Sequence, residues 1–409
     1  MRETVFQPAS ADELGDIVRQ AMEPSRPLHI QGGATKAGWG HPMPGGDTLD
    51  IRGFTGVELY EPEELVLTAK AGTPLSEIQQ LLQNSHQHLA FEPPDYRTLF
   101  GTEAQDQTLG GMMACNMAGP KRIQSGAARD HFLGFEAVSG RGEVFQAGGR
   151  VVKNVTGFDL SKLMAGSFGT LAVMTSLSVK VLPRPEKTRT LLISGLDEEQ
   201  AVEALTKTLK SPQEVNAAAH LPKDQAGRSS VGYVAEAGQA ITAIRIQGPG
   251  PSVLDRLEIL KDLLRAFGEL EELHFNNSNT LWQEIGNVAS LLPDMDKAIW
   301  KLSVPPASGP CVCARLKMLP GAELYLDWGG GLIWLAVEPG DDARAGEIRE
   351  VVALSGGHAT LLRATDDIKR RIPVFQPPSD ALVKLSASLK ANFDPSGILN
   401  PGRMRMIEG

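Results

Sequence analysis

The first part of the chain alternates short apolar runs with stretches of helical periodicity. Apolar residues recur at helical spacing over residues 11–22, directly after a serine that can cap a helix, and again over 75–82. Strands alternating with helices are typical of an α/β arrangement. Short apolar runs bounded by turn residues predict strands at 28–30, 49–51, 57–60 and 65–71.

Beyond residue 190 the pattern changes to longer helices and a hairpin. Amphipathic periodicity predicts helices over 197–209 and 253–267, and a last helix over 378–390. A glycine-rich turn at 327–331 separates two strand-like runs and predicts a hairpin. The apolar runs that predict strands in this part are 191–194, 241–246, 323–326 and 332–337.

The chain length predicts two domains. With 409 residues the chain exceeds the size at which a single core usually keeps growing. We expect a first, α/β-like domain over residues 1–185 and a smaller α+β cap domain over 186–375. Residues 376–409 are expected to form a helix and a turn-rich tail that returns to the site in the first domain. The predicted fold class is therefore α+β.

Charge and cysteine content exclude several classes of protein. The 40 basic and 49 acidic side chains give a net charge of −9, which argues against binding to nucleic acid. Three cysteines are too few for a common iron–sulfur cluster. The N-terminal residues lack the apolar core of a signal peptide, and no apolar run has the length of a membrane helix. These features predict a cytoplasmic protein that meets a membrane only through partners.

Glycine-punctuated turns give the strongest chemical signal. Gln31-Gly-Gly-Ala-Thr-Lys36 follows a predicted strand, where consecutive amides can form a nest for an anion. It has neither the P-loop spacing nor the Rossmann spacing, so alone it also fits a plain turn. Further glycine turns are spread from Gly110 to Pro183 and are separated by apolar runs. This spread suits an extended cofactor better than a single phosphate.

Five motifs in a fixed order resemble those of a known family. After Gln31–Lys36 come Thr108-Leu-Gly-Gly with Asn116 and Gly119, Arg129-Asp with Leu-Gly, Lys153-Asn-Val-Thr-Gly-Phe-Asp159, and Gly166-Ser-Phe-Gly-Thr-Leu171. This order resembles the FAD-binding domain of the vanillyl-alcohol oxidase type. More narrowly, the chain is similar to the FAD-binding E subunits of bacterial glycolate oxidases, from the opening helix to the Asn400-Pro-Gly-Arg403 tail.

The resemblance implies a set of FAD-binding residues. Amides of the first loop would hold the pyrophosphate, the second loop would run beside the pyrophosphate and flavin, and the fifth motif would line the adenosine end. The turn of the fourth motif would lie on the cofactor side, and the tail asparagine near the flavin. The implied residues are Gln31, Gly32, Gly33, Ala34, Thr35, Lys36; Gly110, Gly111, Asn116, Gly119; Thr156, Gly157, Asp159; Gly166, Ser167, Gly169, Thr170, Val173; and Asn400.

Two departures from the family pattern modify this expectation. Relatives commonly carry glutamate where this chain has Phe168, so any polar contact from that side chain is absent. Covalent relatives often place a histidine in the first loop, where this chain has Ala34 and Thr35. We therefore expect FAD to be bound noncovalently.

The catalytic side is less informative. The His-rich Gly-Asp-Gly-Asn motif that related 2-hydroxyacid dehydrogenases use for metal binding and substrate deprotonation is missing, so we expect no metal and assign no catalytic residue. His29, on a predicted core strand, is interpreted as a hydrogen-bonded structural histidine. Arg245 and Arg363 fit either a carboxylate clamp or ion pairs. Cys115 is interpreted as a packed small residue, and Trp328 and Trp334 as hairpin packing or a partner anchor.

Three functions stay open at this point. The preferred one is the FAD-carrying subunit of a complex that oxidises a short 2-hydroxy acid, glycolate, to the 2-oxo acid. Its partners would be a paralogous catalytic flavoprotein subunit and an iron–sulfur subunit that receives the electrons. The alternatives are a self-sufficient FAD-dependent 2-hydroxyacid dehydrogenase of the D-lactate type, and a structural subunit without redox turnover.

Overall fold

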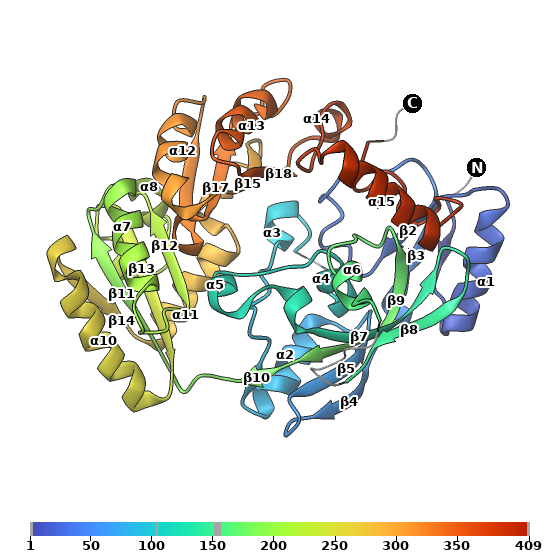
Figure 1. Cartoon of the computed structure of the whole chain (residues 1–409), viewed down its shortest axis with the longest axis horizontal. Helices are drawn as coiled ribbons and strands as arrows, with labels where there is room; N and C mark the ends of the chain where they lie inside the picture. Colours follow the sequence, from blue (N-terminus) through green and yellow to red (C-terminus); the bar gives the residue numbers. More distant parts are fainter. Residues whose placement is uncertain (1–2, 104, 151–156, 407–409) are drawn as a thin grey trace.

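The computed structural model describes residues 3–103, 105–150 and 157–406. Figure 1 shows two bodies side by side, linked low in the picture by the segment around β10 (Leu182–Pro183). Both bodies contain helices and sheets, so the fold is α+β. The domain boundaries at 185 and 375 stay a prediction.

The first body is built on two sheets. A small parallel sheet has the strand order β1-β3-β2, and an antiparallel sheet has the order β4-β5-β9-β7-β8. The strands are β1 (Val5–Phe6), β2 (Leu28–Gln31), β3 (Asp47–Asp50), β4 (Val57–Glu61), β5 (Val66–Lys70), β7 (Phe132–Ser139), β8 (Val144–Gly148) and β9 (Ala172–Lys180); β6 (Gln87–His88) pairs with β10.

Helices of this body are mostly short. Helix α1 begins after Ser10, whose side chain accepts the Glu13 N–H, and it buries Leu14, Val18 and Ala21. Helix α1 confirms the expected helix over 11–22, and α2 confirms the one over 75–82. The helices are α1 (Ala11–Met22), α2 (Leu75–Asn84), α3 (Arg97–Phe100), α4 (Leu109–Ala114), α5 (Arg122–Ser125) and α6 (Leu160–Met164).

The second body is one antiparallel sheet of eight strands. Its order is β14-β11-β13-β12-β16-β17-β15-β18, and β12 and β16 share only the pair His220–Leu326 at its middle. The strands are β11 (Lys187–Ser194), β12 (Ala217–Leu221), β13 (Ile241–Gly248), β14 (Leu270–Leu273), β15 (Ala298–Ser303), β16 (Glu323–Asp327), β17 (Leu332–Val337) and β18 (His358–Arg363).

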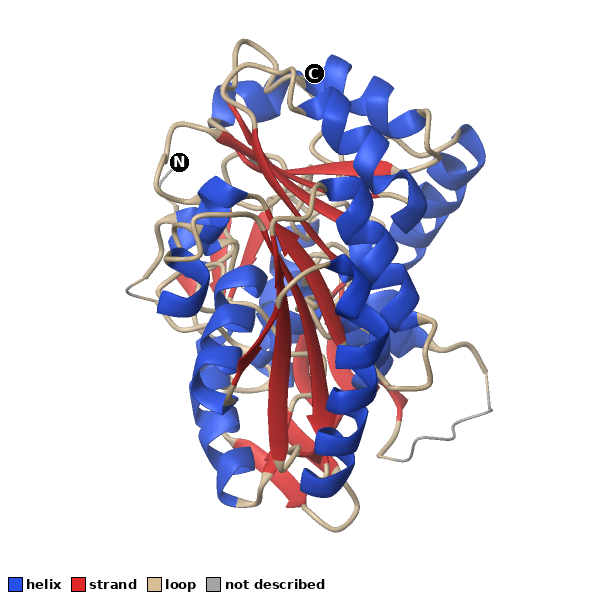
Figure 2. Ribbon diagram, turned by 90° about the vertical axis from the view of Figure 1, so that its left-hand side faces the viewer, coloured by secondary structure: helices blue, strands red, loops and turns tan. Residues whose placement is uncertain are grey.

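Both faces of this sheet are buried. Side chains alternate along each strand, so Ile333 and Leu335 pack under helices while Leu332 and Trp334 join the core shared with the first body. Figure 2 shows helices flanking the long strands. The helices are α7 (Glu198–Leu209), α8 (Lys223–Ala226), α9 (Gly232–Ala235), α10 (Gly250–Leu264), α11 (Phe275–Gly286), α12 (Gly309–Leu316) and α13 (Ala345–Ala353).

The C-terminal segment crosses back to the first body. After α14 (Asp366–Arg371), α15 (Asp380–Phe393) lies beside β2, β3 and β9 in Figure 1. Leu399 forms a parallel bridge to Leu28, and the Asn400 N–H donates to the Leu28 carbonyl at 3.0 Å. The tail therefore extends the small parallel sheet at the strand that carries the Gln31–Lys36 loop.

Candidate cofactor site

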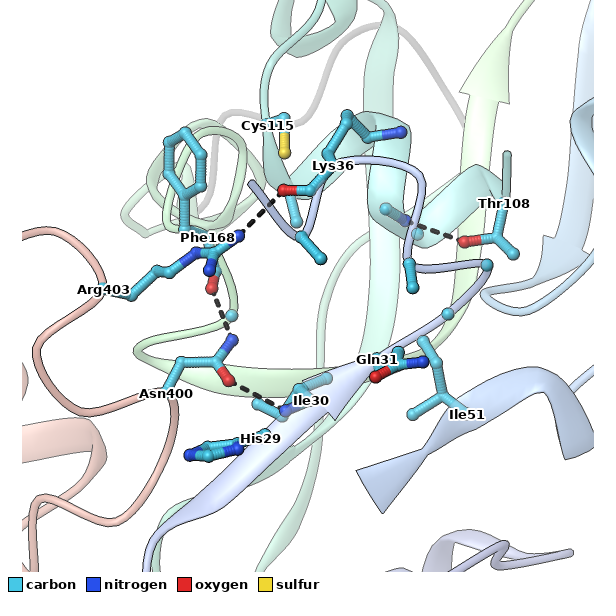
Figure 3. A pocket seen from close by; sticks show the side chains of 18 of the residues that line it. His29, Ile30, Gln31, Lys36, Ile51, Thr108, Cys115, Phe168, Asn400 and Arg403 are labelled. Carbon is cyan, nitrogen blue, oxygen red and sulfur yellow. Dashed lines mark hydrogen bonds between the residues drawn. The ribbon is translucent and has the colours of Figure 1, made fainter. Parts of the chain in front are cut away.

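A cavity of about 140 Å³ lies where the Gln31–Lys36 loop, α4 and the C-terminal tail meet (Figure 3). This volume is below the ~300–1,000 Å³ of typical ligand pockets, so the cavity encloses only part of a molecule as large as FAD. Ten of the residues expected to bind FAD line it. They are Gln31, Gly32, Gly33, Ala34, Thr35, Lys36, Gly110, Gly111, Gly169 and Asn400.

The first loop presents unpaired amides. Ala34 has φ +52°, a left-handed conformation that reverses the direction of successive N–H groups. The amides of residues 33–36 donate to no acceptor within the described ranges. Four consecutive free donors on a loop after a strand form an anion-binding nest, so the loop fits the diphosphate of FAD.

The two glycines of this loop are required by the protein itself. A Cβ on Gly33 would lie 1.6 Å from the Asp106 carbonyl oxygen, and one on Gly32 would lie 2.4 Å from Thr108 Oγ1. Glycine at these two positions was expected to leave room for a ligand. The structure shows that it also allows the loop to pack against residues 106–108, which lead into α4.

Two cations line the cavity. Lys36 Nζ donates to Thr35 Oγ1 at 3.0 Å and to Gln107 Oε1 at 3.1 Å, and burial lowers the Lys36 pKa. Arg403 Nη2 donates to the Lys36 carbonyl at 2.8 Å. Positive charge beside the amide nest suits the two negative charges of a diphosphate. Arg403 was missed as a site residue, although the Asn-Pro-Gly-Arg tail motif contains it.

Asn400 joins the loops on either side of the cavity. Its Oδ1 accepts the Ile30 N–H at 2.8 Å, and its Nδ2 donates to the Phe168 carbonyl at 2.7 Å. Figure 3 shows both bonds. The side chain thus holds the end of β2 against the turn that precedes β9.

Replacing Asn400 with alanine is expected to loosen both loops. Two backbone groups would lose their partners at about 1–3 kcal/mol each, so the free energy of unfolding should fall by roughly 2–6 kcal/mol and FAD should bind more weakly. Chemical denaturation and FAD titration measure both effects. The control is Asn392→Ala on the exposed side of α15, where only the Ser388 carbonyl loses a donor. Equal stability of the Asn400 and Asn392 variants would contradict the assigned role.

An aromatic and sulfur-containing wall completes the cavity. Phe168, at the position where relatives carry glutamate, packs edge-on against Trp39 at 5.3 Å and Phe375 at 5.2 Å between ring centres. Cys115 also lines the cavity, and burial raises the pKa of its thiol, which agrees with a packed residue rather than a nucleophile.

The interpretation of His29 as a hydrogen-bonded histidine was wrong. Its ring lines the cavity, and its buried Nε2 has no hydrogen-bond partner within the described part of the chain. Side chains alternate along β2 as expected, but one face of the small sheet borders the cavity and therefore offers the His29 ring no protein partner. A buried nitrogen left unpaired by the protein is a further sign of a polar ligand in this cavity.

The other residues expected to bind FAD lie outside the cavity lining. Asn116 Oδ1 accepts the Arg129 N–H at 3.0 Å, and the Gly119 carbonyl accepts Trp328 Nε1–H at 3.2 Å. Asp159 caps α6 through the Lys162 N–H. The remaining ones are Gly157 and Gly166, both at positive φ, Ser167, whose carbonyl accepts the Thr170 hydroxyl, and Thr170 itself.

Val173 lies on β9 but does not line the cavity. Val173 is fully buried between Ala172 and Met174, which do line the cavity, so strand alternation turns Val173 to the opposite face of β9. Thr156 lies outside the described residues. A role in FAD binding stays a prediction for all the residues that do not line the cavity.

Neither arginine proposed as a carboxylate clamp is in this cavity. Arg363 donates to the Lys297 and Asp294 carbonyls, at 3.1 and 2.6 Å, and so ties backbone together. Arg245 Nη2 pairs with Glu92 Oε2 at 2.8 Å and joins the two bodies, which confirms the ion-pair interpretation. Among the described residues, no three histidine, cysteine, aspartate or glutamate side chains gather as metal ligands.

The hairpin of the second body packs on the first. Trp334 is buried and meets the Tyr96 ring edge-on, while Trp328 Nε1 donates to Gly119. Lys301 Nζ lies 5.0 and 5.7 Å from the Trp328 and Trp334 ring centres, a cation–π arrangement. Asp327 is buried beside them. Packing thus accounts for both tryptophans.

Burial shifts the titration of the two charged groups in this cluster. Desolvation raises the pKa of the Asp327 carboxyl to about 7, even though the Trp328 N–H donates to it at 2.7 Å. Desolvation also lowers the pKa of Lys301 to about 8. Both groups therefore change charge near neutral pH.

The architecture, the amide nest and the two cations define an FAD-binding oxidoreductase. Residues 3–148 match the family model of the FAD binding domain. Over 387 residues the chain is 36% identical to the glycolate oxidase subunit GlcE of Escherichia coli K12, with 95% of each chain covered. It is 30% identical over 193 residues to the glycolate oxidase subunit GlcD of Bacillus subtilis, covering 47% of this chain and 39% of GlcD.

Solved structures agree on the fold. A 4-ethylphenol oxidase from Gulosibacter chungangensis superposes with a TM-score of 0.72 at 16% identity, covering 98% of this chain and 89% of the oxidase. The chain belongs to the family of the glycolate oxidase subunit GlcE, within the vanillyl-alcohol oxidase type of FAD-binding oxidoreductases that act on CH–OH groups.

Proposed function

We propose that this chain is the FAD-carrying E-type subunit of a glycolate-oxidising complex. A paralogous flavoprotein subunit would take the hydride from glycolate, and this chain would relay electrons toward an iron–sulfur subunit. The likeness to GlcE over 95% of the chain supports the assignment to such a complex. The partial likeness to GlcD is consistent with a paralogous partner.

The observation that carries the relay role is the chemistry of the cavity lining. Oxidation of a 2-hydroxy acid needs a base for the hydroxyl proton and a cation for the carboxylate. Among the described residues, the titratable groups that line the cavity are His29, Lys36, Cys115 and Arg403, without a carboxylate to orient the histidine. Lys36 and Arg403 already bond to the loop. This set suits holding a cofactor better than deprotonating a substrate.

Each residue of the cavity has a role in holding FAD. The amides of the first loop, Lys36 and Arg403 would bind its diphosphate, and Asn400 would keep the two loops at a constant separation. Phe168 and Trp39 would exclude water from one side. Bound FAD supplies a carrier that accepts electrons in pairs and passes them on singly. Noncovalent binding, and attachment to the inner membrane only through partners, belong to this proposal.

No helix in the described ranges combines the length and apolarity needed to span a bilayer.

Anaerobic spectroscopy tests the relay. Glycolate or D-lactate added to the purified FAD-loaded chain is expected to leave the flavin absorbance unchanged, and bleaching should appear once the paralogous subunit is added. Bleaching of the chain alone would replace the proposal with a self-sufficient dehydrogenase. A colourless chain that takes up no FAD would favour a structural subunit. Acid precipitation should release FAD into the supernatant if binding is noncovalent.

A further inference from the structure

A second cavity, of about 390 Å³, lies between the two bodies near β10. It shares no lining residue with the cofactor cavity. Helices α2 and α11 and the segment around β10 border it; in Figure 1, α2 and β10 are in the lower middle and α11 is to their left, in the second body. Its volume falls in the ~300–1,000 Å³ range of small-molecule sites, which form preferentially between domains.

The interior of this cavity carries a buried arginine. The Arg245 side chain is only 3% exposed and pairs with Glu92 at 2.8 Å. Its Nε–H donates to Asn216 Oδ1 at 2.8 Å, and its guanidinium lies 5.1 Å from the Trp282 ring centre. Arg184 lines the exposed side, 5.5 Å from the Phe275 ring. The lining contains two arginines, Arg184 and Arg245, and one carboxylate, Glu92. It is therefore positively charged, although the net charge of the whole chain is −9.

A half-buried histidine in the wall has a ring nitrogen without a partner. The Nε2 atom of His88 is buried and makes no hydrogen bond to any described residue. Burial, with Lys121, Arg184 and Arg245 nearby, lowers the His88 pKa to about 4, so its ring is neutral at pH 7. A neutral ring nitrogen at the cavity wall is left to pair with a polar ligand or water.

Unpaired amide side chains line the mouth from both bodies. Gln79 and Gln83 stand one helical turn apart on α2, and Asn279 and Gln283 stand one turn apart on α11. None of the four side chains has a hydrogen-bond partner within the described ranges. Each amide offers both donors and an acceptor, the chemistry that recognises hydroxyl and carbonyl groups.

We propose that this interdomain cavity binds a small hydroxylated carboxylate. Its carboxylate would pair with the exposed Arg184, while Arg245 stays paired with Glu92 and adds positive charge from the cavity wall; its hydroxyls would meet the amide pairs of α2 and α11. An inorganic ion alone would leave the amides unused and most of the volume empty. Because the site is separate from the cofactor cavity, this inference does not depend on the proposed electron relay. A ligand here would hold the two bodies together, since both contribute to its contacts.

Titration of the purified FAD-loaded chain tests the site. D-Gluconate and citrate are the organic probes and inorganic phosphate is the ionic one, measured by calorimetry and by the thermal midpoint. The organic probes are expected to bind and to raise the midpoint with concentration, while phosphate should bind at least tenfold more weakly. Binding by none of the probes, or by phosphate as tightly as by the organic acids, would overturn the proposal.

Variants locate the binding. Arg184→Gln should weaken binding of the organic probes by about tenfold or more, because one charge-assisted bond is lost, and Gln283→Ala should weaken it severalfold. Both positions are exposed, so the fold should persist. Arg265→Gln, an exposed arginine that pairs only with Asp262 on the surface, is the matched control and should change nothing. Unchanged affinity in both site variants would overturn the assignment to this cavity.

Discussion

Replacing Gly33 with alanine is expected to remove FAD from the purified protein. The new Cβ would lie 1.6 Å from the backbone oxygen of Asp106, so the loop of four free amides must move away from residues 106–108. A loss of ~1.4 kcal/mol in binding already lowers affinity tenfold, and displacement of several charge-assisted bonds exceeds that. The ratio of flavin to protein absorbance after purification measures the effect.

Gly45→Ala is the control for this variant. Nothing lies within 4 Å of a Cβ built on Gly45. Gly45 lies in the segment between the Gln31–Lys36 loop and β3. It should retain FAD like the parent chain. A Gly33 variant with full FAD content would show that the loop can shift without loss of the cofactor, and would contradict the nest as the diphosphate site.

Replacing Asp327 with asparagine is expected to stabilise the protein at alkaline pH. The native pKa, about 7, exceeds the ordinary 3.8, so the native state holds this proton more tightly than the unfolded state does. The corresponding stability is complete below about pH 4 and is lost as pH rises to about 7. A difference of three pKa units corresponds to on the order of 4 kcal/mol. Asparagine cannot ionise and keeps an oxygen for the Trp328 N–H.

Denaturation at pH 5 and pH 8 checks the sign. The stability gained by Asp327→Asn over the parent chain should be larger at pH 8 than at pH 5. Asp262→Asn, on the exposed face of α10, should show no such growth. A gain that is independent of pH would mean that Asp327 does not hold its proton near neutrality.

Local patterns predicted the elements and the core of the cofactor site. The helix over residues 11–22, the strand at 28–30 and the loop at 31–36 depend on nearby residues, because periodicity and turn chemistry act over a few positions. Gly110 and Gly111 of the second loop line the cavity, whereas Asn116 and Gly119 bond to other parts of the protein. Motif spacing cannot tell which members of a turn face the ligand.

Of the two tail residues that line the cavity, Asn400 was predicted and Arg403 was missed. Arg403 contacts Lys36 across more than 360 residues, because the tail pairs with β2. Val173 lies between Ala172 and Met174, which line the cavity, so it faces the opposite side of β9, and its role in FAD binding stays a prediction. His29 was assigned a hydrogen-bond partner that its sheet does not provide.

The sequence by itself determined that this protein is an α+β flavoprotein of the vanillyl-alcohol oxidase type, and it predicted the loop at residues 31–36 as an anion-binding nest. Those features depend on short-range spacing and on the order of motifs. Tertiary structure alone decided that Arg403 and Phe168 complete the cofactor cavity and that Arg245 joins the bodies rather than clamping a substrate there. It also decided that amides of α2 and α11 face a second cavity. These contacts join residues distant in sequence, whose meeting depends on sheet pairing and on packing between the two bodies.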